Sequence, residues 1–94
     1  MKIKHINGTS QLACSCGSWL KHWERFSGRT AMFCSGKVCM EKQNLVGAHV
    51  QKDNSYDSKW HIVPLCNAHN LAGGEMDIPD ATILVSANTS ETCG

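Results

Sequence analysis

Four side chains that can bind a metal, arranged as two close pairs, constrain the fold of this chain more than any other feature. The pairs are Cys34-x4-Cys39 and Cys66-x2-His69. Each pair can turn two donor atoms toward one point, and the chain between the pairs can bring the two points together. The alternative is buried free thiols beside a surface histidine, which does not account for four donors at compatible spacing. The pattern predicts a closed structural Zn²⁺ site.

The size of the chain gives such a site a physical role. We expect residues 1–94 to form a single domain, in which hydrophobic residues are 41% of the total and charged residues 18%. That composition is typical of a globular chain rather than a disordered one. The core that 94 residues can bury is small, so a metal would add stability where small domains need it.

The six cysteines could be disulfides in a secreted protein or metal ligands in a reducing compartment. No apolar stretch follows the charged start of the chain, so we expect no signal peptide. No segment is long enough to span a membrane. We therefore expect a cytoplasmic protein whose cysteines are ligands.

Charge is unevenly distributed although the net charge is only +1. All nine Lys and Arg lie in residues 1–59 against four acids, whereas residues 60–94 carry four acids and no Lys or Arg. A basic N-terminal lobe could face phosphates, which predicts DNA or RNA as a partner. The alternative is a mixed, solvated surface.

Apolar periodicity predicts one amphipathic helix and several short strands. Ser18 can cap the helix and Gly28 can end it. The apolar face of this helix consists of Trp19, Leu20, Trp23 and Phe26. We expect an arm or short strand within residues 3–13, strands over 30–34, 45–50, 60–63 and 82–85, a polar loop over 54–58, and a short helix from Cys66 to about Leu71 that ends at Gly73-Gly74.

The remaining cysteines are Cys14, Cys16 and Cys93. Cys14 or Cys16 could replace a member of the first pair. Cys16 and Cys93, with His22, could form a second ligand set or a redox pair, and small buried thiols are the simpler alternative.

These motifs resemble the HNH (ββα-metal, treble-clef) nuclease superfamily. The shared pattern is two knuckle cysteines, then a histidine within an apolar strand, then Cys-x2-ligand at a helix start followed by asparagine. The branch most similar is the zinc-stapled one that includes endonuclease VII-type junction resolvases. The resemblance covers about residues 34–72. It implies a zinc-stapled treble-clef (ββα-metal) core. Together with the amphipathic helix and the last strand that the apolar pattern predicts, we expect an α+β fold with an N-terminal helix and a C-terminal strand.

The resemblance also implies roles for individual residues. Cys34, Cys39, Cys66 and His69 would hold zinc. His49 would fall at the position of the general base, and Asn70 at the position of a ligand to a catalytic Mg²⁺ or Mn²⁺. An imidazole near its ordinary pKa can take a proton from water at neutral pH.

One position departs from the family pattern. Ala48 stands where an active member has a metal ligand, so a second oxygen donor would have to come from elsewhere. The loop residues that could supply it are Asp53, Asn54 and Asp57. The alternative for His49 is a buried histidine that braces the zinc site.

The chain is also similar to small bacterial and phage proteins of unknown function. They share the segments that correspond here to residues 16–23 (CGSWLKHW), 47–50 (GAHV) and 63–70 (VPLCNAHN). This likeness supports a stand-alone zinc-binding domain and implies no activity.

Three functions are compatible with these features. The first is a zinc-binding, HNH-like module that recognises nucleic acid or a protein partner without cleaving it, which we favour because of Ala48. The second is an active divalent-metal-dependent endonuclease that hydrolyses phosphodiesters. The third is a redox or metal-handling protein that uses the additional cysteines, for which only Lys21 and His22 near Cys16 provide support.

Overall fold

The computed structural model describes residues 1–6, 16–36, 39, 41–52, 59–72, 74–88 and 92. Within these residues the chain forms a mixed α+β fold. The elements are β1 (Lys2–His5), α1 (Trp19–Ser27), β2 (Leu45–Lys52), β3 (His61–Cys66), α2 (Asn67–Ala72), β4 (Glu75–Asp77) and β5 (Val85–Ser86).

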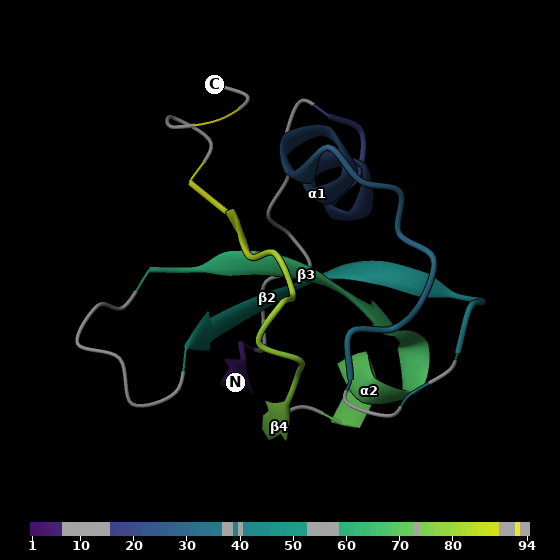
Figure 1. Cartoon of the computed structure of the whole chain (residues 1–94), viewed down its shortest axis with the longest axis vertical. Helices are drawn as coiled ribbons and strands as arrows, with labels where there is room; N and C mark the ends of the chain where they lie inside the picture. Colours follow the sequence, from purple (N-terminus) through teal and green to yellow (C-terminus); the bar gives the residue numbers. More distant parts are fainter. Residues whose placement is uncertain are drawn as a thin grey trace.

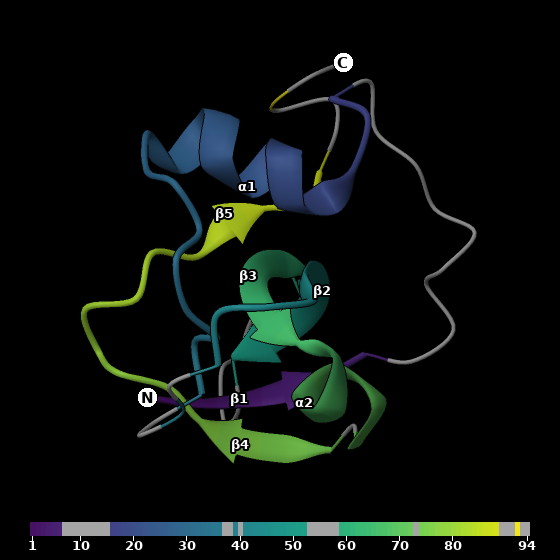
Figure 2. The same cartoon turned by 90° about the vertical axis from the view of Figure 1, so that its right-hand side faces the viewer.

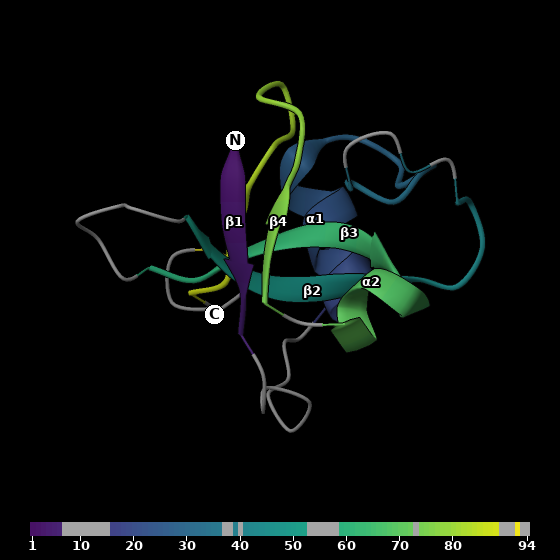
Figure 3. The ribbon, with the colours of Figure 1, turned by 90° about the horizontal axis from the view of Figure 1, so that it is seen from below.

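The strands form one antiparallel sheet in the order β4-β1-β2-β3-β5. Its centre is the β2–β3 pair, which runs from Leu45↔Cys66 to Val50↔His61. Figure 1 shows α1 above this pair and β4 below it. Figure 3, seen from below, shows β1 and β4 crossing under β2 and β3, so the sheet is strongly twisted. The two faces of the β2–β3 pair are therefore covered by different elements.

Helix α1 begins and ends where the sequence predicts. The Ser18 side chain accepts a hydrogen bond from the backbone N–H of Lys21. Gly28 adopts a left-handed conformation (φ 72°), and its N–H donates to the carbonyl of Glu24. A side-chain cap at the start and a left-handed glycine at the end are the two devices that satisfy the open backbone groups of a helix. This prediction is confirmed.

A glycine allows α1 to lie against the sheet. A Cβ atom on Gly47 would lie 2.3 Å from the carbonyl carbon of Trp19 and 2.5 Å from the backbone nitrogen of Leu20. The start of α1 therefore crosses β2 directly over Gly47, where the backbone of the helix meets the backbone of the strand. No other residue type would permit this approach.

Two apolar clusters fill the spaces on either side of the β2–β3 pair. The larger one lies between this pair and β1 and includes Ile3, Val50, Val63, Leu65 and Ile78. The smaller one lies under α1 and has the buried residues Trp23, Ile62 and Val85. The larger cluster also contains Cys34 and Cys66, so these two predicted metal ligands pack against the apolar core.

Strand β3 is longer than expected because Pro64 lies within it rather than ending it. Pro64 pairs with Gly47 in the register of β2 and β3, whereas β5 pairs only with His61 and Ile62. The Pro64 carbonyl accepts a hydrogen bond from the backbone N–H of Ser35 at 2.8 Å. The N and C=O groups of a strand residue point to the same side, so the missing N–H of Pro64 faces away from β2. No ladder bond is lost there.

Two of the predicted strands are wrong or shifted. Residues 30–34 form no strand, because the N–H of Ala31 donates to the carboxylate of Glu24 and the N–H of Cys34 donates to the carbonyl of Glu41. The strand expected over 82–85 is only Val85–Ser86. The carbonyl of Ile83 accepts from the indole N–H of Trp23 instead of a neighbouring strand.

Strand β4 was not expected. Two of its three residues are acids, which disfavour strands, and its register with β1 places Asp77 opposite Lys2 and Glu75 opposite Lys4.

None of the helices in the described ranges is long and apolar enough to cross a membrane.

We predict that Gly47→Ala lowers the free energy of unfolding by about 2–3 kcal/mol, because the added methyl group forces α1 away from β2. Gly28→Ala is the matched control. No atom lies within 4 Å of a Cβ at Gly28, so it should lose only the roughly 1 kcal/mol of a left-handed glycine. Urea denaturation of zinc-saturated protein measures both losses. A loss for Gly47→Ala no larger than that of Gly28→Ala would contradict this account.

Candidate metal centre

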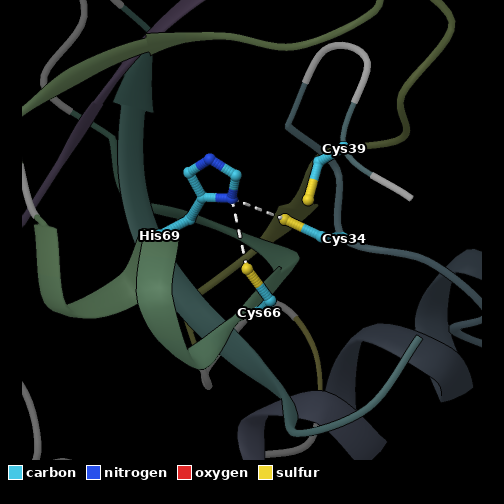
Figure 4. A group of neighbouring side chains, drawn as sticks. All are labelled: Cys34, Cys39, Cys66 and His69. Atoms are coloured by element: carbon cyan, nitrogen blue, oxygen red, sulfur yellow. Dashed lines mark hydrogen bonds between the residues drawn. The ribbon is translucent and has the colours of Figure 1, made fainter. Parts of the chain in front are cut away.

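The four predicted metal ligands lie together at one end of the β2–β3 pair. Each of Cys34, Cys39, Cys66 and His69 offers one donor atom, and these atoms all lie within 4.8 Å of one another. Cys34 and Cys66 are buried, and Cys39 and His69 are half-buried. Figure 4 shows the three sulfur atoms and the His69 ring converging from separate segments of the chain. The structure thus brings together all four donors that the sequence singles out.

The distances between donors fit a shared metal ion. Nδ1 of His69 lies 3.2 Å from Sγ of Cys34 and 3.2 Å from Sγ of Cys66. Two ligands of a tetrahedral zinc ion, with Zn–S near 2.3 Å and Zn–N near 2.0 Å, are separated by about 3.5 Å. Small shifts of the side chains would therefore place a zinc ion between the donors, with Nδ1 as the ligand nitrogen of His69.

The first two ligands lie on a turn that is held by backbone hydrogen bonds. The N–H of Ser35 donates to Pro64 of β3, and the N–H of Cys39 donates to the carbonyl of Gly36 at 3.0 Å. The N–H of Gly36 points to Sγ of Cys34 at 3.4 Å. A Cβ on Gly36 would lie 3.2 Å from Cε1 of His69, so the turn packs closely on the imidazole. Residues 37, 38 and 40 lie outside the described part of the chain.

The other two ligands come from the junction of β3 and α2. Cys66 is the last residue of β3, and α2 begins at Asn67 rather than at Cys66 as the sequence suggests. Strand β3 continues directly into α2, so the side chains of Cys66 and His69, three residues apart, still point to the same side. Register is also fixed at this end of the sheet, because Cys66 pairs with Leu45.

Burial and local hydrogen bonds act differently on the thiols. Burial raises the pKa of Cys34 to about 11, against smaller contributions from backbone N–H groups. Burial also opposes ionisation of Cys66, but the backbone N–H groups of His69 and Ala68 and the neighbouring thiols more than offset it, and the pKa of Cys66 is lowered. Thiolates are the metal-binding form, so metal binding to this cluster requires loss of the thiol protons.

His49 occupies a different part of the molecule. It is 3% exposed and its ring meets Trp19 and Trp60 edge-on, with centroid distances of 4.6 and 5.9 Å. Its Nε2 atom is buried and has no hydrogen-bond partner in the described residues. Burial, followed by the nearby charges of His5 and His22, lowers the pKa of His49 to about 4. The ring is therefore neutral at neutral pH and closed in by indoles.

Asn70 lies on the opposite side of the sheet from His49. Its Oδ1 atom is 2.8 Å from Nε2 of His5, which links α2 to β1. His5 pairs with Val50, and directly paired residues of antiparallel strands point to the same face. His49, the neighbour of Val50, points to the other face. Figure 2 shows α1 above the β2–β3 pair and α2 below it, beside β1.

Of the other residues considered for catalysis, only Ala48 lies in the described part of the chain, and its side chain offers no donor. Ala48 is 2% exposed and belongs to the larger apolar cluster. Asp53, Asn54 and Asp57 lie outside the described residues, as do Cys14 and Cys93.

Sequence reasoning missed the partners that fix the candidate residues. His5 holds Asn70, and Trp19 and Trp60 enclose His49. The Ser-Gly pair directly after Cys34 was a local signal for a tight metal-binding turn. No local signal identified His5, because its contact with Asn70 spans 65 residues.

We predict that Cys66→Ser removes one zinc ion per chain and lowers Tm by more than about 10 °C, since a kcal/mol corresponds to roughly 4–8 °C in a domain of this size. Asn67→Ser, at the exposed next position, is the matched control and should keep both the zinc and the Tm. Native mass spectrometry and thermal denaturation give the two readouts. An unchanged melting curve after verified loss of zinc would refute a structural role.

We predict that the free energy of unfolding of the wild type falls more steeply on acidification than that of His49→Leu. The pKa of His49 rises from about 4 in the folded protein to its ordinary 6.5 on unfolding, so the folded state binds fewer protons between these values. Stability present above pH 6.5 is lost as pH falls through 4, by roughly 2–3 kcal/mol. Protonation of the metal ligands affects both proteins alike. Parallel pH profiles of the two proteins would show that His49 does not titrate in this way.

Comparisons with known proteins add no relative. No family model matches the sequence. No curated protein and no solved structure matches the chain either. The likeness to HNH-type domains therefore rests on the motif residues alone and stays a prediction.

Proposed function

We propose that this chain is a small zinc-binding, HNH-like domain that binds nucleic acid without cleaving it. The observation that carries the proposal is the cluster of Cys34, Cys39, Cys66 and His69 with all donor atoms within 4.8 Å. Three thiolates and an imidazole favour zinc over harder ions. Four protein ligands leave no position for a reacting water, which favours a structural role for the metal.

The same proposal treats the Cys34–Cys39 turn, the β2–β3 pair and α2 as the counterpart of a ββα-metal core. Support comes from their order along the chain and from the metal ligands at the turn and at the start of α2.

The positions of the candidate catalytic residues argue against hydrolysis. A general base must reach a water that a metal also contacts. His49 is enclosed by Trp19 and Trp60, whereas the Asn70 oxygen contacts His5 on the other face of the sheet. Ala48 adds no donor. A histidine and an asparagine so arranged are better suited to packing and to linking α2 with β1.

The fold changes which basic residues can contact phosphates. Lys2 and Lys4 of β1 lie opposite Asp77 and Glu75 of β4 in the strand register, so an acid faces each of these two lysines. Helix α1 and its C-terminal end keep three exposed basic residues, which are Lys21, Arg25 and Arg29. We assign the phosphate-binding surface to these three side chains.

A protein partner is the second candidate. Met32 is 65% exposed and Phe33 is 40% exposed, on the segment that leads into the metal-binding turn. A cavity of about 340 Å³ beside Phe33 is also lined by Cys39, Pro79 and Thr82. Exposed apolar side chains next to a cavity are a feature of protein-binding surfaces.

We predict that Lys21→Ala/Arg29→Ala weakens binding to labelled DNA or RNA and reduces the slope of log K against log salt by about 1 for each lost contact. Lys2→Ala/Lys4→Ala is the matched control, because it removes the same charge at positions where an acid of β4 lies opposite each lysine. Fluorescence anisotropy at several salt concentrations measures both variants. The nucleic acid should remain intact with added Mg²⁺ or Mn²⁺.

Two results would overturn the proposal. Cleavage that requires the divalent metal and disappears in His49→Ala would establish the endonuclease. Equal losses of affinity in the two double variants would show that net charge, rather than the surface of α1, attracts the nucleic acid.

A further inference from the structure

We infer that the cavity beside the metal-binding turn takes an unpaired base of a single-stranded nucleic acid, which stacks on Phe33. The inference rests on the proposed function and adds the form of nucleic acid that the domain binds. The cavity has a volume of about 340 Å³ and is lined by residues 33–36 and Cys39 on one side and by Pro79 and Thr82 on the other. Figure 2 shows both segments on the same side of the molecule, between α1 and β4.

Phe33 gives the cavity an aromatic ring that solvent reaches. The side chain lines the cavity and is 40% exposed. Every nucleobase has a flat π face, so an aromatic side chain can stack on a base of any sequence. Inside a duplex the faces of each base are covered by its neighbours, and reaching one costs unstacking and unpairing. A ring placed in this way therefore favours single strands.

The walls of the cavity are held in place by backbone hydrogen bonds. On one side the N–H of Ser35 donates to the carbonyl of Pro64 in β3 at 2.8 Å, and on the other the N–H of Thr82 donates to the carbonyl of Pro79 at 3.0 Å. Cys34 and Cys39, which also line the cavity, belong to the metal centre. Pockets that hold small molecules measure roughly 300–1,000 Å³, so this cavity suits a single flat group.

Basic side chains lie where the phosphates beside such a base would pass. Nζ of Lys42 is 5.4 Å from the centroid of the Phe33 ring, and Lys42 is exposed. Arg29, which belongs to the phosphate-binding surface proposed above, is four residues before Phe33 and is also exposed. Positive charge thus continues from the end of α1 to the cavity, which is complementary to a nucleic-acid backbone.

Two acids near the cavity already have partners. Oε1 of Glu41 accepts hydrogen bonds from the backbone N–H groups of Lys42 and Gln43, both at 3.0 Å. The carboxylate of Asp80 lies 2.6 Å from the amino group of Met1. These contacts offset part of the negative charge that would otherwise repel phosphates.

The hydroxyl groups of Ser35 and Thr82 favour a base over an apolar side chain of a protein partner. Both residues line the cavity and are half-buried, and neither hydroxyl has a hydrogen-bond partner among the described residues. A hydroxyl both donates and accepts, so it suits the polar edge of any base. An apolar side chain in the cavity would cover these groups without satisfying them.

Fluorescence anisotropy with three labelled probes tests the inference on zinc-saturated protein. The probes are a short oligothymidine, a strand of the same length that lacks its bases, and the corresponding duplex. We expect the wild type to bind oligothymidine most tightly. Phe33→Ala should weaken that binding by roughly 5- to 150-fold, which corresponds to the 1–3 kcal/mol of one stacked base, and should leave binding of the abasic strand unchanged. Phe33→Trp should retain the preference for bases.

Phe26→Ala is the matched control. Phe26 is 38% exposed and has the guanidinium of Arg25 at 5.1 Å from its ring, but it does not line the cavity. Its loss should not change the preference for bases. Native mass spectrometry should find one zinc ion per chain in each variant, which shows that the metal centre is intact.

Three results would overturn the inference, and they separate it from the proposed function. Equal binding of oligothymidine and the abasic strand by the wild type would remove the base site and leave phosphate binding in place. Equal losses in Phe26→Ala and Phe33→Ala would place the base outside the cavity. No binding of any probe by the wild type would refute the proposed function itself.

Photocrosslinking of the wild type tests the same contact without a variant. In oligothymidine that carries 5-iodouracil in place of thymine, light joins the base to the side chain on which it stacks, with loss of hydrogen iodide. Mass spectrometry of the digested complex should find the cross-link at Phe33. Cross-links confined to other exposed aromatic residues, such as Trp60, would contradict the inference.

Discussion

The convergence of four donor atoms at one end of the sheet is the constraint on which the rest of the structure depends. Cys34 and Cys39 belong to a turn, Cys66 to the end of β3 and His69 to α2, so one ion would connect three segments. The turn is also held by the bond from Ser35 to Pro64, at the edge of β3 that β5 leaves open. A chain of this size buries only a modest apolar surface, and metal binding would add the stability that so small a core does not provide.

The opposite face of the sheet is organised by contact with α1. Gly47 lets the helix backbone meet β2, and the next residue on that face, His49, is enclosed between Trp19 and Trp60. The same approach that seats the helix therefore excludes water from the histidine and lowers its pKa. Asn70 lies at the other face of the sheet, where its side-chain oxygen contacts His5. The sheet thus separates the two residues on which a nuclease would depend, with His49 under α1 and Asn70 against β1.

Local signals predicted the parts of the structure that depend on local chemistry. The caps of α1 and the ligand spacing of Cys66 and His69 follow from adjacent residues, and both were found. Features decided by distant partners were missed. Strand β4 forms because β1 pairs with it. Residues 30–34 form no strand because Ala31 and Cys34 donate their backbone N–H groups to Glu24 and Glu41 instead of to a strand. Pro64 fits within β3 because β5 ends before it reaches that position. The faces of His49 and Asn70 depend on the register of three strands, which no single segment encodes.

X-ray absorption spectroscopy at the zinc edge tests the central claim most directly, because it reports the ligands rather than the content of metal. The account predicts a four-coordinate shell of three sulfurs near 2.3 Å and one nitrogen near 2.0–2.1 Å, which is the shell that Cys34, Cys39, Cys66 and His69 would provide. A shell dominated by oxygen and nitrogen, or one with an open position filled by water, would contradict a closed structural centre.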